Sequence, residues 1–332
     1  MPPRISVLMP CFNHGAFIDE AVASVLTQTL QDFEIVIVDD GSTDPGTRET
    51  LARLNAPRTT VLTTANRGLP AARNFAARHA SGEFYCALDA DDKLAPTWFE
   101  QAVGVLDAQP AVAFVSHWLE AFGDERWTWA PERCDLPALL ARNAVNGAAL
   151  VRRQAFDAVG GYDEAMREGC EDWDLWLRLV ESGRHGAIIP EVLFYYRRRA
   201  DSMSRRMLDA PAYRRPLEVL VQKHVASYRA HLPDVIVAKE AEVLHLTREI
   251  ADLECDRLTT LEPALRRARE ELEAILEKRT RAQAVRRREE EQEQLAWRAA
   301  ELERQISALH ASWSWRITAP LRKLYALLGG GR

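Results

Sequence analysis

Two stretches decide the fold: ISVLM at residues 5–9 and EIVIV at residues 34–38. Both are short and almost continuously apolar, which is typical of strands that are buried on both faces of a parallel sheet. Residues 16–30, which separate them, place four apolar side chains at helical spacing: Phe17, Val22, Val25 and Leu26. This order predicts a βαβ unit.

The same alternation continues along the chain. We expect a third strand at residues 60–63, a helix at residues 69–79 and a fourth strand at residues 83–88. The pattern predicts an α/β fold, in which a mainly parallel sheet is sandwiched by helices. Ligands of such sheets bind beyond the carboxyl ends of the strands, so polar residues at those ends are candidate site residues.

Composition and charge exclude several classes of protein. With 332 residues and 47% hydrophobic content, the chain has room for one large domain and an appendage. The net charge of −6 argues against a nucleic-acid partner, since such proteins neutralise phosphates with basic residues. The five cysteines lack the short spacings of zinc or redox sites, and no signal peptide or membrane span is evident. We therefore expect a cytoplasmic protein with reduced thiols.

The composition changes near residue 211, which predicts three regions: an α/β domain at 1–210, a helical, coiled-coil-like extension at 211–310 and a tail at 311–332. Within the extension, apolar residues recur in steps of four and three: Leu261, Leu265, Ala268, Leu272 and Ile275. Pro263 marks a break in the helix or a new first turn. A helical hairpin packed on its own domain and a coil that forms a homo-oligomer both fit this pattern.

The tail mixes tryptophans with basic and aliphatic residues, as in SWSWRITAPLRKLY at residues 312–325. Such a segment suits peripheral contact with the inner face of the plasma membrane, and it equally suits packing against protein.

The strongest local signal is Leu88-Asp89-Ala90-Asp91-Asp92, directly after the fourth predicted strand. Carboxylates crowded at a strand end raise one another's pKa unless a cation is present. Mg²⁺ or Mn²⁺ suits such a site, because these ions take one or two carboxylates and complete their shell with phosphates and water. A solvated acidic turn before the helix that starts near Pro96 is the alternative.

Three further motifs are ambiguous by themselves. Asp39 and Asp40 in DDGSTD suit a tight turn or a nucleoside contact. The stretch NRGLPAARN at residues 66–74 carries two arginines, which suit anion binding or a solvated helix face. The acids of EDWDLW at residues 171–176 lie in the first turn of a predicted helix. Their negative charge interacts favourably with the helix dipole there, or one of them provides a general base.

Taken in order, these motifs resemble the family 2 inverting glycosyltransferases of the GT-A fold. The resemblance covers residues 4–204 and is carried by ISVLMPCFNHG with IVDDGSTD, by NRGLPAARN, by LDADD, and by GGYDE followed by EDWDLWLRL. The tail resembles that of bacterial enzymes that build surface polysaccharides.

The resemblance implies a role for each matching residue. Pro10, Phe12, Asp39 and Asp40 resemble a nucleobase and ribose pocket, and Asn66 and Arg73 resemble further nucleotide contacts. Asp89 and Asp91 match the DXD motif. Asp91 is the better candidate for direct coordination of the metal, and Asp89 for contact with the ribose or with the groups around the metal. In the ED motif, Asp172 resembles the catalytic base and Glu171 its orienting neighbour.

One position departs from the family pattern. Many relatives carry a histidine after the tyrosine-arginine pair, whereas this chain has Tyr196-Arg197-Arg198-Arg199. An arginine cannot bind a metal, but it can hold a diphosphate through paired hydrogen bonds. We therefore assign Arg197 and Arg199 to the diphosphate and leave the third metal ligand open.

The sequence thus predicts a metal-dependent enzyme that transfers a sugar from a nucleotide-diphosphate donor, with UDP favoured by analogy, to a glycan or lipid-linked acceptor. A nucleotidyltransferase or nicotinamide enzyme is disfavoured, because the first strand is followed by PCFNHG, which lacks the glycine fingerprint. A coiled-coil assembly protein with a degenerate sugar-nucleotide domain is the remaining alternative, and the acids retained at all three sites argue against it.

Overall fold

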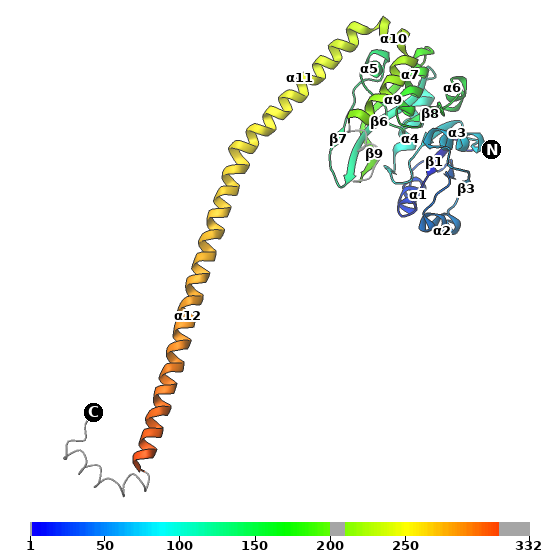
Figure 1. The fold of residues 1–332 in the computed structure, drawn as a ribbon. Coiled ribbons are helices and arrows are strands. Elements are labelled where there is room, and N and C mark those ends of the chain that lie inside the picture. The colour runs from blue at the N-terminus through cyan, green and yellow to red at the C-terminus, as the bar shows by residue number, and fades with distance from the viewer. Residues whose placement is uncertain (1, 200–209, 312–332) are drawn as a thin grey trace, which may run out of the picture. The chain divides into compact units, whose positions relative to one another are not determined.

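The computed structural model describes residues 2–199 and 210–311, and Figure 1 shows their fold. The described strands form one nine-stranded sheet in the order β3-β2-β1-β4-β8-β6-β9-β5, with β7 paired to β6. The strands are β1 (Ile5–Cys11), β2 (Phe33–Asp39), β3 (Thr59–Thr63), β4 (Phe84–Ala87), β5 (Lys93–Leu94), β6 (Val112–Gly123), β7 (Thr128–Trp129), β8 (Leu150–Arg152) and β9 (His185–Arg198). The helices are α1 (Ile18–Leu26), α2 (Pro45–Arg53), α3 (Leu69–His79), α4 (Trp98–Ala108), α5 (Leu136–Ala141), α6 (Arg153–Ala158), α7 (Glu171–Glu181), α9 (Ala210–Lys223), α10 (Val225–Ala230), α11 (Leu232–Asp256), the π-helical turn η1 (Arg257–Leu261) and α12 (Glu262–Ala311).

The first four strands form the parallel half of the sheet that the sequence predicts. β1 pairs in parallel with β2 and β4, and β2 pairs in parallel with β3. Beyond β4 the sheet is mixed, because β8 runs antiparallel to both β4 and β6 while β9 runs parallel to β6. With only three residues, β8 is too short to leave a periodic signal in the sequence.

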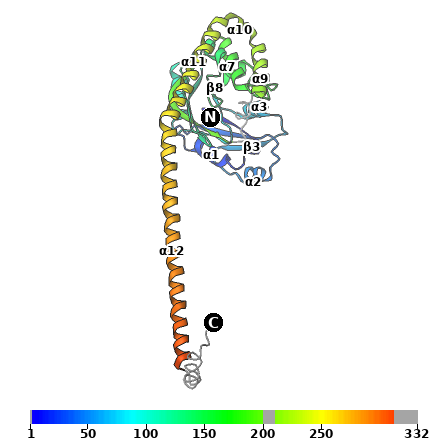
Figure 2. The same cartoon turned by 60° about the vertical axis from the view of Figure 1, so that its left-hand side comes forward.

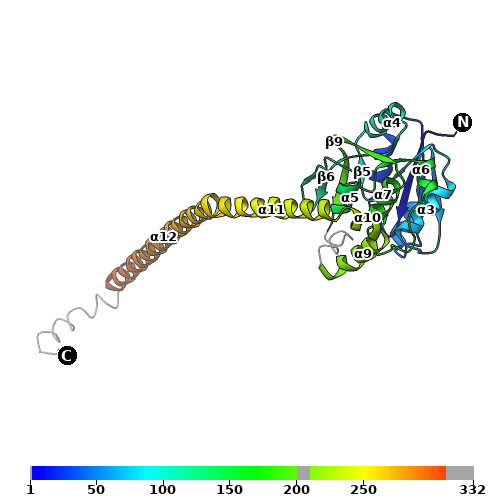
Figure 3. The ribbon, with the colours of Figure 1, turned by 90° about the horizontal axis from the view of Figure 1, so that it is seen from above.

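Both faces of the sheet are covered by helices, which explains the continuous apolar runs of β1 and β2. Ile5, Val7 and Met9 of β1 face one core together with residues of α1 and α4. Leu8 faces the other core, which contains residues of α3 and α7. Figure 3 shows α4 and α7 on opposite sides of the sheet.

Helix α2 was not predicted from the sequence, although its start is well specified. The Asp44 side chain accepts a hydrogen bond from the backbone N–H of Thr47 at 2.7 Å, and Pro45 occupies the first turn. An aspartate cap followed by proline is a common helix start. The end of the DDGSTD motif therefore caps a helix.

Contacts divide the chain into two units, residues 1–244 and 245–332. The division comes later than the predicted boundary at residue 210, because the buried Leu220 of α9 and the buried His224, which directly follows α9, pack within the first unit. Figure 2 shows α9 and α10 beside α7.

The second unit contains the rest of α11, η1 and α12. Apart from the half-buried Pro263 and Glu301, its side chains up to residue 308 are exposed. The predicted tail motif at residues 312–325 lies outside the described residues. Within the two described ranges, no helix combines the length and the apolar character needed to cross a bilayer.

Candidate active site

The acidic motif after β4 lies where the sequence predicted, beyond the carboxyl end of a central strand. Asp89 is about one third exposed, whereas the Asp91 side chain is 12% exposed and Asp92 is buried. Burial raises the pKa of Asp91 and, more strongly, that of Asp92, and the neighbouring carboxylates add to both shifts. Asp92 accepts a hydrogen bond from the backbone N–H of Arg197 at 2.7 Å, so this carboxylate anchors the end of β9.

Arg73 of α3 joins the acidic motif to the start of α7. Its guanidinium donates to Asp89 Oδ1 at 2.8 Å and to Glu171 Oε1 at 2.7 Å, and the residue is 3% exposed. Burial raises the pKa of Glu171 to about 7, although Arg73 opposes this shift. Arg73 is thus a bridge between the two predicted catalytic motifs, and this bridge is its observed role in the structure. A direct nucleotide contact from Arg73 stays a prediction.

Asp172 lies beside this bridge, at the N-terminal end of α7. Asn143 Nδ2 lies 3.3 Å from both carboxylate oxygens, and the backbone N–H of Trp173 donates to Oδ1 at 2.7 Å. The backbone of Gly147 comes close as well, because a Cβ built there would lie 3.9 Å from Asp172 Oδ2 and 3.5 Å from Arg73 Nη2. Burial raises the pKa of Asp172. A carboxylate oriented by an amide and with a raised pKa suits a general base.

Asp39 and Asp40 are buried at the end of β2, where both support loops. Asp39 Oδ1 accepts from the backbone N–H of Ser42 at 2.8 Å. The two oxygens of Asp40 accept from the backbone N–H groups of Arg67 and Gly68 at 2.9 and 2.8 Å. Asp40 therefore holds the loop that carries the exposed Asn66. Each carboxylate oxygen has a second lone pair, so the predicted nucleoside contacts remain compatible with these bonds.

The end of β1 offers an exposed aromatic ring. Pro10 is buried within β1, while Phe12 is 41% exposed. Asn13 follows with φ of +60°, and its side-chain oxygen accepts from the backbone N–H groups of Thr43 and Asp44. This turn fixes the loop between β1 and α1, and it sets the position of the next residue, His14.

His14 and Arg199 approach Asp91 from two different elements. His14 Nδ1 lies 3.8 Å from Asp91 Oδ1, and Arg199 Nη2 lies 3.6 Å from Asp91 Oδ2. Arg199 Nη2 also lies 3.0 Å from His14 Nε2. In contrast, Arg197 donates to the backbone oxygen of Asp91 at 2.8 Å and pairs with Glu20 at 3.0 Å. Of the two predicted diphosphate arginines, Arg199 is the one that faces the acidic motif.

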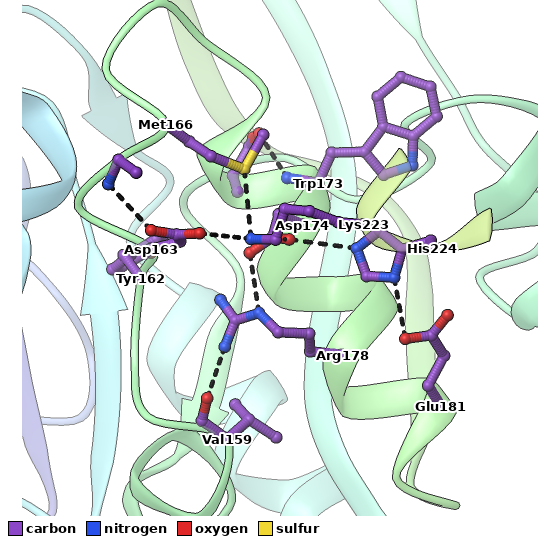
Figure 4. A network of polar contacts seen from close by, with 12 residues as sticks. Val159, Tyr162, Asp163, Met166, Trp173, Asp174, Arg178, Glu181, Lys223 and His224 are labelled. Carbon is purple, nitrogen blue, oxygen red and sulfur yellow. Dashed lines mark hydrogen bonds and ion pairs between the residues drawn. The ribbon is translucent and has the colours of Figure 1, made fainter. Parts of the chain in front are cut away.

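A second polar network, shown in Figure 4, connects α7 to Lys223 and His224. Asp174 is fully buried and interacts with three basic side chains: Arg178 Nε at 2.8 Å, Lys223 Nζ at 2.6 Å and His224 Nε2 at 3.1 Å. His224 Nδ1 lies 2.8 Å from Glu181 Oε2. The EDWD motif therefore points two acids toward the site and one toward α9.

Comparison with known families agrees with this geometry. The sequence model described as Glycosyl transferase family 2 matches residues 6–162, and that of the Glycosyltransferase like family 2 matches residues 135–240. The chain belongs to glycosyltransferase family 2. Together the two matches contain all the predicted site residues, from Pro10 to Arg199.

The chain is similar to several bacterial proteins. The glycosyltransferase EpsE of Bacillus subtilis is 28% identical over 216 residues, which cover 61% of this chain and 76% of EpsE. An uncharacterized glycosyltransferase of Haemophilus influenzae is 27% identical over 53% of this chain and 62% of its own length. The crystal structure of S. aureus TarS residues 1–349 with UDP-GlcNAc aligns with a TM-score of 0.53 at 20% identity, covering 60% of each chain. That likeness supports the GT-A fold.

The sequence analysis did not identify two residues that contact the predicted site residues, His14 and Asn143. His14 follows the first strand directly, in the same stretch as Phe12, so its place at a strand end was a usable signal. Asn143 is 29 residues from Asp172 in the chain and had no such signal.

Proposed function

We propose that the chain is an inverting glycosyltransferase, which transfers a sugar from a nucleotide-diphosphate donor to a glycan or lipid-linked acceptor. The observation that carries this proposal is the bridge of Arg73, because it joins the DXD motif to the helix that begins with Glu171 and Asp172. A donor-side acid and an acceptor-side base must be held next to each other for a single displacement. A solvated acidic turn has no need of a buried arginine that reaches a second motif.

The comparisons support UDP as the carrier, and the proposal of a surface polysaccharide as the product rests on the resemblance of the tail. TarS has been crystallised with UDP-GlcNAc and shares the fold of this chain. EpsE is described as a glycosyltransferase. We carry the UDP-sugar donor over to this chain as part of the proposal, on the strength of the shared fold and the matching motifs.

The residues fit a divalent ion that is held largely by its substrate. No cluster of three His, Cys, Asp or Glu residues that could hold an ion exists within residues 2–199 and 210–311. Asp91, with Asp89 beside it, offers the one or two carboxylates that Mg²⁺ or Mn²⁺ takes when phosphates and water complete the shell. Burial and, after it, the neighbouring carboxylates raise the pKa of Asp91 and of Asp92, and a cation would relieve the repulsion among the carboxylates. When bound, the ion would neutralise negative charge on the diphosphate.

The protein's own groups perform the remaining steps. Asp172, oriented by Asn143, accepts the proton of the acceptor hydroxyl. The acceptor oxygen then forms its bond to the anomeric carbon as the bond from that carbon to the diphosphate oxygen breaks on the opposite face, which inverts the configuration. The leaving diphosphate takes the bonding electron pair, and Arg199 lies where a guanidinium can stabilise the added charge. Glu171 keeps Arg73, and with it Asp89, in place.

Two substitutions separate the proposed roles. In Asp172→Asn, we expect UDP-sugar binding with Mn²⁺ to stay near the wild-type affinity by calorimetry, while transfer falls about 10²–10⁴-fold, the usual contribution of a general base. In Asp91→Ala, we expect the Mn²⁺-dependent part of donor binding to be lost as well. Asp157→Asn is the matched control, since Asp157 is exposed and pairs only within its own helix with Arg153.

Equal loss of donor affinity in both variants would contradict the separate roles of Asp91 and Asp172. A wild-type chain that binds no nucleotide sugar would instead favour the degenerate assembly protein.

A further inference from the structure

The second unit carries an apolar stripe along α11, η1 and α12. Nine residues make up this seam: Leu246, Ile250, Leu253, Leu258, Leu261, Leu265, Ala268, Leu272 and Ile275. Their spacing alternates between four and three residues, which is the pattern of a coiled-coil core, with one exception. The step from Leu253 to Leu258 is five residues.

The π-helical turn η1 (Arg257–Leu261) begins one residue before the end of this step. In a regular α-helix five residues make about 1.4 turns, so the parts of the seam before and after the step would face in different directions. In η1 the backbone N–H of Glu262 donates to the carbonyl of Arg257, five residues back. A turn closed by such bonds takes up one extra residue. The wide turn therefore returns both parts of the seam to one face.

The wide turn has a local cause in the sequence. Pro263 has no N–H and cannot bond to the carbonyl four residues before it, so the α-helical pattern cannot continue through this point. The extra residue and the proline that tolerates it thus occur together. The extra residue alone would turn the second part of the seam away from the first, and the proline alone would interrupt the helical hydrogen bonds. Together they form the wide turn, and the seam stays continuous.

The seam has no cover within its own unit. The eight large aliphatic side chains of the seam are 49–71% exposed. At about 60–120 Å² each, burial of these side chains from two helices would remove on the order of 1,000–2,000 Å² of apolar surface, which reaches the size of a stable protein interface. None of the nine seam positions carries a polar side chain that would demand a different partner sequence.

We propose that the seam packs against the same seam of a second copy of this chain, and that η1 keeps the two seams in contact across residues 253–261. The proposal is independent of the reaction that the first unit catalyses.

The oligomeric state of the full chain tests the proposal. By light scattering coupled to size exclusion, we expect at least twice the 37.5 kDa mass of one chain. Leu265→Asp combined with Leu272→Asp should return the mass to that of one chain. Ala274→Asp is the control, because residue 274 lies on the helix face away from the seam. Unchanged thermal melting of the first unit in all variants excludes misfolding as the cause.

A pair of length variants tests η1 itself. Deletion of Arg257 shortens the exceptional step to four residues, so the seam stays continuous and the oligomer should persist. Insertion of one alanine after Arg257 lengthens the step to six residues, which separates the two parts of the seam, and the oligomer should dissociate at concentrations where the wild type stays associated. A wild-type chain of single mass, an oligomer that survives both aspartates, or equal behaviour of the two length variants would overturn the proposal.

Discussion

Replacement of His224 by leucine tests how this residue, which directly follows α9, holds the helix that carries Asp172. The His224 side chain is 2% exposed and lies between two carboxylates, with Nε2 at 3.1 Å from Asp174 Oδ1 and Nδ1 at 2.8 Å from Glu181 Oε2. Both ring nitrogens face acceptors, so the imidazolium is the form that satisfies both. Leucine fills a similar volume and removes both hydrogen bonds.

The structure sets the size of the effect. A hydrogen bond to a charged group contributes about 1.5–3 kcal/mol, and His224 makes two. Part of the free energy lost with these two hydrogen bonds is recovered, because burial of a leucine requires no desolvation of a charge. In addition, Asp174 keeps its ion pairs with Arg178 and Lys223. We expect the free energy of unfolding to fall by about 2–4 kcal/mol. The melting temperature of a unit of this size should fall by about 5–15 °C.

The loss should depend on pH in a defined direction. Burial alone would lower the pKa of His224, but the hydrogen bonds to Asp174 and Glu181 outweigh it and raise the pKa above 6.5. The charged form therefore stabilises the fold fully below pH 6.5, and the contribution is lost as the pH rises through the folded pKa. Burial would raise the pKa of Asp174, yet His224 and Lys223 lower it to about 2, so its contribution is lost only in acid, below 3.8.

Denaturant unfolding followed by tryptophan fluorescence at pH 6, 7.5 and 9 measures the effect. The difference between wild type and His224→Leu should be largest at pH 6 and should shrink toward pH 9. His245→Leu is the matched control, because the His245 side chain is 72% exposed. A loss below about 1 kcal/mol, less than a single hydrogen bond to a charged group contributes, would refute the reasoning, as would a loss that is constant across these pH values.

Three further outcomes follow from single contacts. Arg199→Gln should lower the affinity for a nucleoside diphosphate about tenfold or more, since one charged contact contributes about 1.5–3 kcal/mol. The control Arg133→Gln, on the exposed surface, should leave this affinity unchanged. Equal affinities of the two variants by calorimetry would contradict the diphosphate role of Arg199. Gly186→Ala should lower stability by about 1–3 kcal/mol, because its Cβ would lie 2.3 Å from the buried Phe114 ring; an unchanged denaturation midpoint would show that the core relaxes. A thiol reagent at pH 8 should label Cys255 quickly and the four buried cysteines only after unfolding. The reason is that burial raises the pKa of each buried thiol to between about 11 and about 12. Rapid labelling of more than one thiol in the native chain would contradict this expectation.

The elements with strong periodicity were predictable from the sequence. The helix at residues 69–79 was predicted with the bounds that α3 has, and the first two strands were located to within two residues at each end, because continuous apolar runs mark strands buried on both faces. Helix α2 and every strand after β4, including β6, β8 and β9, were not predicted. β8 is three residues long, and α2 begins in a stretch whose aspartates and glycine also suit a turn.

The candidate site was predictable in its parts and not in its connections. Acids at strand ends and at a helix start were visible as patterns, so Asp89, Asp91 and Asp172 could be named. Arg73 looked like a solvated or nucleotide-binding arginine, because its two partners lie 16 and 98 residues away along the chain. Asp174 looked like a third acid of the same motif until its side chain was found to contact His224, 50 residues away.

The sequence by itself determined the local facts: which stretches are apolar on both sides, where acids follow strands, and where a proline follows an irregular step in a heptad pattern. These depend on neighbours within a few residues. Only the tertiary structure decided which charges meet, and therefore that Arg73 bridges two motifs, that His14 and Arg199 both face Asp91, and that α9 belongs to the first unit. The reason is that ion pairs and burial depend on distances in space, which a chain of this length can set in many ways until its strands are ordered in a sheet.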